Sequence, residues 1–142
     1  MKNKGFTLIE LLVVIAIIGI LSAIVLASLD TARNKGVDAA ARADLDDARA
    51  QAENYYDSQS PNTYVGVCTT AATGIVNMLN GAANDEGTTV GGSGGVTCNS
   101  SASAWAAETS LKNAINGASN WCVDSTGTST PRSAALSSNT NC

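Results

Sequence analysis

The chain has 142 residues, with 8 Lys and Arg side chains against 12 Asp and Glu, no histidine, and a formal net charge of −4 at pH 7. This acidic balance argues against nucleic-acid binding by the bulk of the chain, because affinity for phosphate backbones depends on clustered Lys and Arg. The absence of histidine removes the commonest general base and metal ligand, and the length allows only one small domain besides a membrane segment.

The first element is an apolar run from Phe6 to Leu29 that contains one ionisable side chain, Glu10. As a helix, this run would be roughly 36 Å long, enough to cross the ~30 Å hydrocarbon core of a bilayer. A carboxylate at membrane depth costs on the order of 2.5 to 3.5 kcal/mol, so it must neutralise, move to the interface or pair with a cation. Glu10 therefore needs a partner that the run itself does not contain.

Two ordinary explanations for this N-terminus are a secretory signal peptide and a plain signal anchor. Lys2 and Lys4 supply the positive flank, which places the N-terminus in the cytoplasm and the remainder of the chain outside. The run is too long for a signal peptide, whose apolar core spans about 7 to 15 residues before a small-residue cleavage site. A plain anchor explains the topology, but it explains neither Glu10 nor the glycine directly before the run.

The start of the run resembles the type III leader and N-terminal helix of the type IV pilin and pseudopilin superfamily, in the residues Gly5-Phe6-Thr7-Leu8-Ile9-Glu10-Leu11-Leu12-Val13-Val14-Ile15. The resemblance implies that a prepilin peptidase cleaves between Gly5 and Phe6 and that Phe6 is then N-methylated. It also implies the missing cation, because the new α-amine of Phe6 would neutralise Glu10 of a neighbouring subunit in a filament. Such a close pair of opposite charges offsets much of the desolvation that either would suffer alone. Glu10 would then set the register of assembly.

The chain departs from the best-studied pilins in one respect: no proline lies near the end of the apolar run, and Pro61 is the first in the chain. Local melting of the helix in a filament would have to begin at Gly19 or Ser22, which weaken a helix by about 1 kcal/mol or less. Loss of the leader would also remove Lys2 and Lys4 and change the formal side-chain charge from −4 to −6, since two positive groups disappear.

From Asp30 to about Tyr56 the pattern predicts an alanine-rich, amphipathic continuation of the helix. Apolar side chains recur every three or four residues on one face: Val37, Ala41, Leu45, Ala48, Ala52 and Tyr55. Opposite charges also lie three or four residues apart, in the pairs Asp38–Arg42, Arg49–Glu53, Asp30–Arg33 and Asp46–Arg49. We expect these charges to form a solvated face, with pairing between subunits as the alternative, and Gly36 to be a soft point in the helix.

Beyond the turn at residues 59–62 the chain is rich in Thr, Ser, Gly and Asn, and its predicted elements are short. We expect an extended segment at 64–68, a short helix at 75–82 and a flexible loop at 84–95. Strands are predicted at 96–98, 103–107 and 120–124, with a helical turn at 111–115 and a tight turn at 124–127 that leads toward Thr128 and Thr130. A three- or four-stranded antiparallel sheet is the economical result.

Four cysteines, Cys68, Cys98, Cys122 and Cys142, lie on the side predicted to be outside, where an even number implies disulfides. Their wide spacing and the absence of histidine give a zinc site poor support. Four cysteines allow three pairings, and we favour Cys68 with Cys98 and Cys122 with Cys142. The second loop resembles the C-terminal disulfide-bounded region of many pilins. Each bridge would contribute ~3 to 4 kcal/mol on the chain-entropy model, which would compensate for a thin core.

No other motif is typical of an enzyme or a cofactor site. Gly91–Gly95 lacks the strand, helix and downstream acid of a dinucleotide fingerprint, so it is interpreted as a linker. Calcium binding by Asp85 and Glu86, or by Asp124 with nearby hydroxyl oxygens, is a minor alternative. Asn99-Ser100-Ser101 fits a glycosylation sequon, although an exposed loop is the default interpretation.

We therefore predict an α+β fold, a pilin-like lollipop in which a long N-terminal helix, transmembrane in its first half, packs on a small disulfide-stapled antiparallel sheet. Its parts would be a leader (1–5), a transmembrane or filament-core helix (6–29), the amphipathic continuation (30–56) and an extracytoplasmic domain (57–142). The subunit would lie in the cytoplasmic membrane with its C-terminal domain outside, and would then reach the cell surface in a pilus.

The resemblance implies a structural subunit of a type IV pilus, which is not an enzyme and uses no cofactor or metal. The assembled pilus would serve adhesion, motility or DNA uptake, the last being disfavoured by the acidic domain. The partners would be further copies in a helical filament, the prepilin peptidase, the assembly platform and, before assembly, membrane lipid. Alternatives are a type II secretion pseudopilin and a membrane-anchored binding module that never polymerises.

Overall fold

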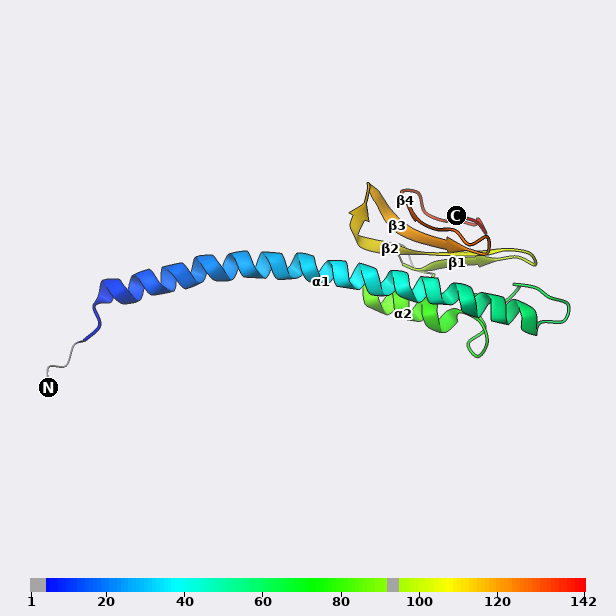
Figure 1. Cartoon of the computed structure of the whole chain (residues 1–142), viewed down its shortest axis with the longest axis horizontal. Helices are drawn as coiled ribbons and strands as arrows, with labels where there is room; N and C mark the ends of the chain where they lie inside the picture. The colour runs from blue at the N-terminus through cyan, green and yellow to red at the C-terminus, as the bar shows by residue number, and fades with distance from the viewer. Residues whose placement is uncertain (1–4, 92–94) are drawn as a thin grey trace. The chain divides into compact units, whose positions relative to one another are not determined.

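The computed structural model describes residues 5–91 and 95–142; the predicted positive flank, Lys2 and Lys4, and the centre of the glycine-rich linker lie outside them. The elements follow the order α1 (Leu8–Ser58), α2 (Val76–Glu86), β1 (Thr97–Ser100), β2 (Trp105–Ile115), β3 (Ala118–Asp124) and β4 (Ser129–Arg132) (Figure 1). The chain divides into two compact units, Met1–Asn34 and Lys35–Cys142.

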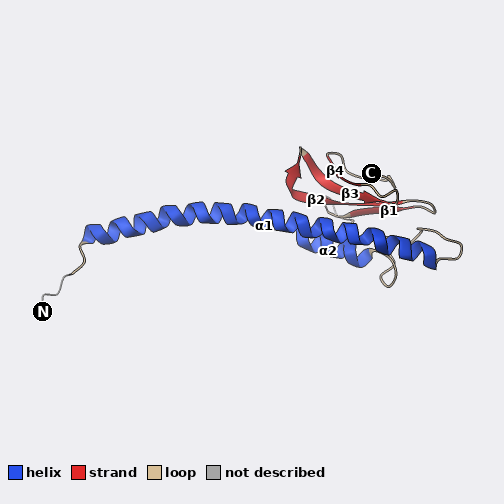
Figure 2. Ribbon diagram, in the orientation of Figure 1, coloured by secondary structure: helices blue, strands red, loops and turns tan. Residues whose placement is uncertain are grey.

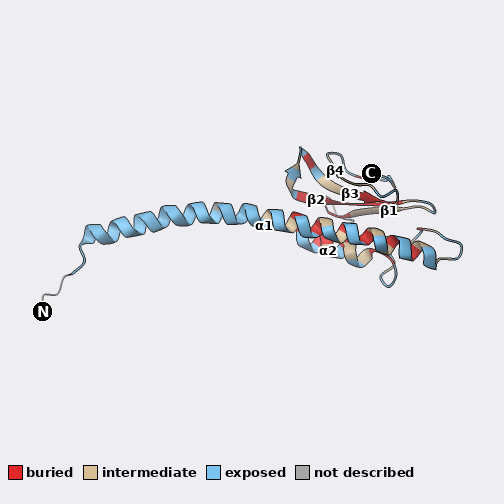
Figure 3. Cartoon of the chain, viewed as in Figure 1, coloured by how far each residue is buried: buried red, intermediate tan, exposed pale blue. Residues whose placement is uncertain are grey.

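The first unit is the apolar part of α1. Its most apolar stretch has a mean hydropathy of 3.0, and none of that stretch is buried within the chain, so the helix is long and apolar enough to cross a membrane. Figure 3 shows this half of the helix as continuously exposed. Large apolar side chains face outward all round it, from Phe6 at 80 % exposed to Leu29 at 62 %. Such a surface is unfavourable in water and favourable in lipid or against other helices.

The second unit contains the core. From Lys35 onward α1 packs together with α2 against one face of the sheet (Figure 2). The predicted apolar face of the helix supplies five fully or nearly fully buried side chains: Ala41, Leu45, Ala48, Ala52 and Tyr55. The sheet contributes Trp105, Ala107 and Val123 to the same cluster. The helix face is built mostly from alanine, which brings the α1 backbone close to the sheet.

The sheet is a four-stranded antiparallel meander in the order β1-β2-β3-β4. The predicted α+β class, with a long N-terminal helix packed on a small antiparallel sheet, is confirmed. The predicted helical turn at 111–115 is wrong, because these residues form the second half of β2. That strand returns as β3 through Asn116 and Gly117, whose φ angles of 52° and 83° fit a primed hairpin turn. The Asn-Gly pair was the signal available in the sequence.

The second face of the sheet is covered by the C-terminal segment, residues 133–142. Leu136 is fully buried there against Ala106 and Cys122, with Cys142 at the edge of this smaller cluster. The segment is tied to the sheet by the Cys122–Cys142 disulfide, while Cys68–Cys98 joins β1 to the segment that precedes α2. These are the two pairings that the sequence analysis favoured. Because β2 is buried on both faces, a small domain acquires two thin apolar layers instead of one thick core.

Several predicted boundaries are corrected. The short helix extends to Glu86, so the first residues of the predicted loop are helical, and Gly87 ends α2 in a left-handed conformation with φ 69°. Residues 65–69 form turns instead of an extended segment, and a cis bond joins Ser60 to Pro61. The first predicted strand runs from Thr97 to Ser100, the second begins at Trp105, and Ser129–Arg132 completes the sheet as β4.

Four of the charged side chains expected on the solvated face of α1 are exposed, namely Asp30, Arg33, Asp46 and Glu53, whereas Asp38 is buried. In the part of the chain that the structure describes, none of the four predicted charge pairs forms an ion pair. Arg42 stacks over Trp121 at 5.3 Å from the ring centroid, Asp46 accepts a hydrogen bond from Ser129, and Glu53 accepts one from Tyr64. These side chains bind the sheet and loops of their own domain, because tertiary partners displace weak helical pairs.

Candidate functional site

The N-terminus of α1 is built as a capping box. Thr7 precedes the first helical residue, and its backbone N–H and hydroxyl both donate to Glu10 Oε2, at 2.8 and 2.6 Å. In return, the Glu10 backbone N–H donates to Thr7 Oγ1 at 3.3 Å. This is the S/T-x-x-E arrangement that satisfies orphan donors at a helix start. Thr7-Leu8-Ile9-Glu10 before an apolar run is the usual signature of this capping role, which was not among the predictions for Thr7 and Glu10.

The capping box engages one carboxylate oxygen and leaves the other accessible. The hydrogen bonds that the Glu10 carboxylate accepts within the described residues all end on Oε2, and the side chain is exposed. Glu10 therefore has a fixed orientation on the first turn of α1, while Oε1 keeps its capacity to accept from an external donor. A cation that reaches this turn meets a carboxylate already positioned by its own helix.

Phe6 and Glu10 border the same hollow on the helix surface. The hollow measures about 400 Å³ and is lined by Phe6, Ile9, Glu10, Val13 and Val14. Its walls are apolar except for the Glu10 carboxylate, so it suits the flank of another apolar helix that carries a single positive group. The predicted cleavage point, Gly5–Phe6, lies directly before the helix and is exposed.

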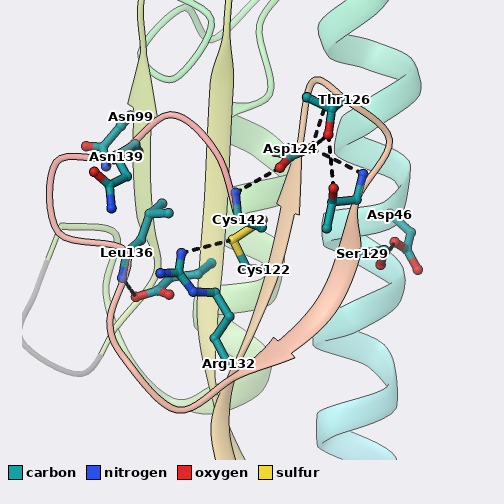
Figure 4. Close-up of a disulfide and its surroundings, with 12 residues drawn as sticks. Asp46, Asn99, Cys122, Asp124, Thr126, Ser129, Arg132, Leu136, Asn139 and Cys142 are labelled. Carbon is teal, nitrogen blue, oxygen red and sulfur yellow. Dashed lines mark hydrogen bonds between the residues drawn. A yellow bond between two sulfur atoms is a disulfide. The ribbon is translucent and has the colours of Figure 1, made fainter.

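A second group of functional candidates surrounds the Cys122–Cys142 disulfide (Figure 4). Asp124 accepts hydrogen bonds from the N–H groups of Thr126 and Thr128 through Oδ1, and from that of Cys142 through Oδ2. Burial raises the pKa of Asp124, but the hydrogen bonds, first those from Thr126, lower it more, so its pKa lies below the usual range. Asp124 thus closes the β3–β4 turn and anchors the chain terminus.

The same surroundings bear on the calcium alternative. Both Asp124 oxygens already accept internal hydrogen bonds, and at the other candidate position Asp85 is exposed whereas Glu86 is 1 % exposed. Among the residues described, no three Asp, Glu, Cys or His side chains gather in the manner of a metal site.

The sequon residue Asn99 is part of the same anchor. Its side-chain amide donates to the backbone carbonyls of Ser137 and Asn139, at 2.7 and 2.9 Å. Glu108, from β2, accepts the Leu136 N–H at 2.6 Å. Three side chains of the sheet, Asn99, Glu108 and Asp124, therefore hold residues 136–142 at separate points. Figure 4 labels Asn99 and Asp124 beside this segment.

Comparison with known proteins identifies the family of the segment that contains the start of α1. Residues 1–26 match the family model described as the prokaryotic N-terminal methylation motif. The type IV wide pilus major component PilA4 of Thermus thermophilus is 37% identical over 103 residues, a match that covers 67% of this chain and 79% of the relative. This chain belongs to the type IV pilin family. No solved structure gives a significant match to this pilin.

The family assignment confirms the resemblance on which the sequence analysis relied. The methylation motif spans the predicted leader, the capping box and most of the apolar run of this pilin, and the match to PilA4 extends over most of the chain. The long helix, the small antiparallel sheet and the two disulfides agree with that assignment.

Proposed function

We propose that this pilin is a structural subunit of a type IV pilus, held in the cytoplasmic membrane by residues 6–29 until it is added to a filament. The observation that carries the proposal is the exposed apolar surface of α1 with one oriented carboxylate on its first turn. A bilayer satisfies the apolar surface before assembly, and neighbouring helices satisfy it afterwards. A homo-oligomeric filament follows, because each copy carries the same unpaired surface.

The proposed register comes from Glu10 and Phe6. Cleavage by the prepilin peptidase after Gly5 creates an α-amine on Phe6, which is then methylated and remains positively charged. In the filament this amine would lie on Glu10 Oε1 of a neighbouring subunit, in the hollow that Phe6 and Glu10 border. The pair offsets the burial of both charges. Helices offset from this register would leave a carboxylate unpaired in an apolar core.

Close packing along the remaining helix would use small residues. Gly19, Ser22 and Ala23 lie in the exposed apolar part of α1, where they permit neighbouring backbones to approach. Growth of the filament requires an assembly platform in the membrane, and the finished pilus would display the C-terminal domain at the cell surface. The description of PilA4 as a major pilus component favours a pilus over a type II secretion pseudopilin.

The first test is the substitution Glu10→Leu in cells that produce pili. We expect the variant to enter the membrane as the wild type does, because leucine suits a bilayer, and the amount of sheared pili to fall at least tenfold. Asp30→Asn is the matched control, since it removes a carboxylate at the other end of the apolar run. Wild-type amounts of pili from Glu10→Leu would refute the role of Glu10 in register.

The second test is mass spectrometry of the mature N-terminus. We expect a chain that begins at methylated Phe6. A chain that keeps Met1 would instead support a membrane-anchored module that never polymerises, and one that begins beyond Ser22 would support a signal peptide. Adhesion, motility and DNA uptake are distinguished by comparing piliated and non-piliated cells in each assay.

A further inference from the structure

A buried cluster of charged side chains joins three elements of the C-terminal domain. Asp38 of α1 is 4 % exposed and Glu86, the last residue of α2, is 1 % exposed. Lys112 and Asn113 of β2 lie between them: the N–H groups of both residues and the Asn113 side-chain amide donate to the Asp38 carboxylate, at 2.6, 3.0 and 2.8 Å. Asp38 is therefore saturated with donors, and it fastens α1 to β2.

The Glu86 carboxylate has far fewer hydrogen-bond donors around it than Asp38 has. Its Oε2 lies 3.8 Å from Lys112 Nζ, and its Oε1 is buried without a hydrogen-bond partner among the described residues. The Lys112 ammonium group instead donates to the backbone carbonyl of Glu86. The remaining charged groups that bear on Glu86 are Asp38 from α1 and Asp85 on α2 itself, both negative. An ionised Glu86 would thus be a buried anion with one distant cation.

The position of Glu86 on its helix adds to this cost. The C-terminus of a helix carries a partial negative charge, which disfavours an anion and favours a cation. Lys112 lies where such a cation is expected, at the Glu86 carbonyl. The N–H of Gly87 donates to the carbonyl of Asn84, and the N–H of Thr88 donates to that of Ala83. The cation and the backbone hydrogen bonds at this turn therefore stabilise the end of α2, whereas a negative charge on Glu86 destabilises it.

We propose that Glu86 is a proton-dependent latch: with its carboxyl group protonated, it holds the end of α2 against α1 and β2, and on ionisation that end loosens. In the neutral state of Glu86, the charges of Asp38 and Lys112 balance each other. In the ionised state two buried carboxylates face one ammonium group. Opening the last turn of α2 lets water reach Glu86, which relieves the imbalance.

The direction of the pH response follows from the surroundings. Burial, and after it the charge of Asp38, raise the pKa of Glu86 from its ordinary 4.5 to about 7, while Lys112 acts in the opposite direction. A carboxyl group whose pKa is raised by folding stabilises the folded state fully below pH 4.5, and this contribution is lost as the pH rises to about 7. The latch is closed in mild acid and open in mild alkali.

The test uses the full chain in detergent micelles. Amide hydrogen exchange over residues 76–91 is measured at pH 5.5 and pH 8.5, about 1.5 units on either side of the pKa of Glu86, and is expressed as protection factors, which correct for the intrinsic effect of pH. We expect the protection of the last turns of α2 in the wild type to fall about tenfold or more at the higher pH. Protection of β3 at the two pH values serves as the internal reference.

Three variants assign the effect. Glu86→Gln should be well protected at both pH values, whereas Asp85→Asn, its exposed neighbour, should keep the pH response with the transition at slightly lower pH, because one weak negative charge is lost. Lys112→Gln should move the transition to higher pH, because the cation that favours ionisation of Glu86 is lost. Equal protection of wild-type α2 at the two pH values, or an unchanged response in Glu86→Gln, overturns the proposal.

A direct titration covers the case in which Glu86→Gln does not fold. The carbon-13 resonance of the Glu86 carboxyl group in the wild type should titrate with a midpoint near 7, and a midpoint near the ordinary 4.5 would overturn the proposal. None of these measurements depends on filament formation, so the latch and the proposed function succeed or fail separately.

Discussion

Thr7 Oγ1 donates to Glu10 Oε2 at 2.6 Å, so the carboxylate proposed to select a neighbouring subunit is also the side chain that caps its own helix. The two tasks use different oxygens. Oε2 is engaged by Thr7, and Oε1 has no partner in the described structure. The geometry explains why a charge is placed at the first turn of α1 and not elsewhere along the apolar run: only there does the backbone itself offer donors that a carboxylate can satisfy.

Thr7→Val separates these two tasks. The variant keeps the Glu10 charge but loses the cap, which should weaken the first turn of α1 by about 1 kcal/mol. We expect faster amide exchange over residues 8–11 in micelles, together with pili that still assemble in reduced amount. Complete loss of pili, equal to that in Glu10→Leu, would show that the orientation of Glu10 and not only its charge is needed.

Asp38→Ala should strongly destabilise the C-terminal domain. Removing the carboxylate leaves three donors of Lys112 and Asn113 without their acceptor at a buried position, which costs about 3 kcal/mol. Urea unfolding of the full chain in micelles, followed by the near-ultraviolet circular dichroism of Trp105 and Trp121, measures the change. Asp47→Ala, on an exposed position of the same helix, is the control and should change stability by less than about 0.5 kcal/mol. Similar values for both variants would show that the Asp38 contacts contribute little.

Asn99→Ala should loosen the C-terminal segment. The variant loses two hydrogen bonds to backbone carbonyls, worth about 1 kcal/mol each, so the Cys122–Cys142 disulfide should be reduced and alkylated several times faster. Asn139→Ala is the matched control, because Asn139 contributes its carbonyl oxygen and not its side chain. Equal reduction rates in the two variants would contradict the anchoring role. The same contacts imply that a glycan on Asn99 would compete with folding of this segment.

Asp124→Asn should reduce stability at neutral pH but not in strong acid. The carboxylate has a lowered pKa, so its contribution is present above about pH 3.8 and is lost as the pH falls through the lower folded value. We expect the free energy of unfolding of the wild type to exceed that of the variant by about 2 kcal/mol at pH 6, with the difference shrinking as the pH falls below 3.8. The comparison is made by thermal unfolding in micelles across this range. Glu108 has a raised pKa, so its contribution to stability has the opposite pH dependence. Because Glu108 is present in both proteins, this contribution does not affect the difference between them. A difference in stability that does not depend on pH would show that ionisation of Asp124 is not its cause.

Loss of either disulfide should lower the free energy of unfolding of the C-terminal domain. The paired cysteines are separated by 30 and 20 residues, and closing loops of this size is worth about 3 kcal/mol on the chain-entropy model. We expect the double variants Cys68→Ser/Cys98→Ser and Cys122→Ser/Cys142→Ser each to lower the unfolding midpoint in urea. Only the second should expose Leu136 to solvent, which faster amide exchange over residues 133–142 would report.

Much of the structure of the N-terminal half could be predicted from local patterns in the sequence. A long apolar run and an apolar stripe at helical spacing specify α1 because helical periodicity is a short-range property of the chain. The buried positions Ala41, Leu45, Ala48 and Ala52 were predicted correctly for that reason. The sheet was predicted less well. Residues 111–115 have apolar side chains at a spacing that suits a helical turn, but they continue β2 to the hairpin, where Ile115 pairs with Ala118 after an irregularity in the register beyond Ser110.

The charged side chains show the same limit. Asp38 lies four residues before Arg42, a spacing that predicts a surface ion pair, yet its carboxylate is buried on β2. Asn99, Glu108 and Asp124 become anchors of the C-terminal segment only because the meander brings three strands beneath it. No local pattern contains that information, since the partners are far apart along the chain.

The sequence by itself determined the membrane-length apolar helix, the single carboxylate at its start and an even set of cysteines, because each depends on composition or on spacing within a few residues. The tertiary structure alone decided which charges are buried and how Glu86 comes to lie beside Asp38 and Lys112. Those properties arise from the contact of α1, α2 and β2, where desolvation and hydrogen bonding outweigh the weak preferences of neighbouring residues.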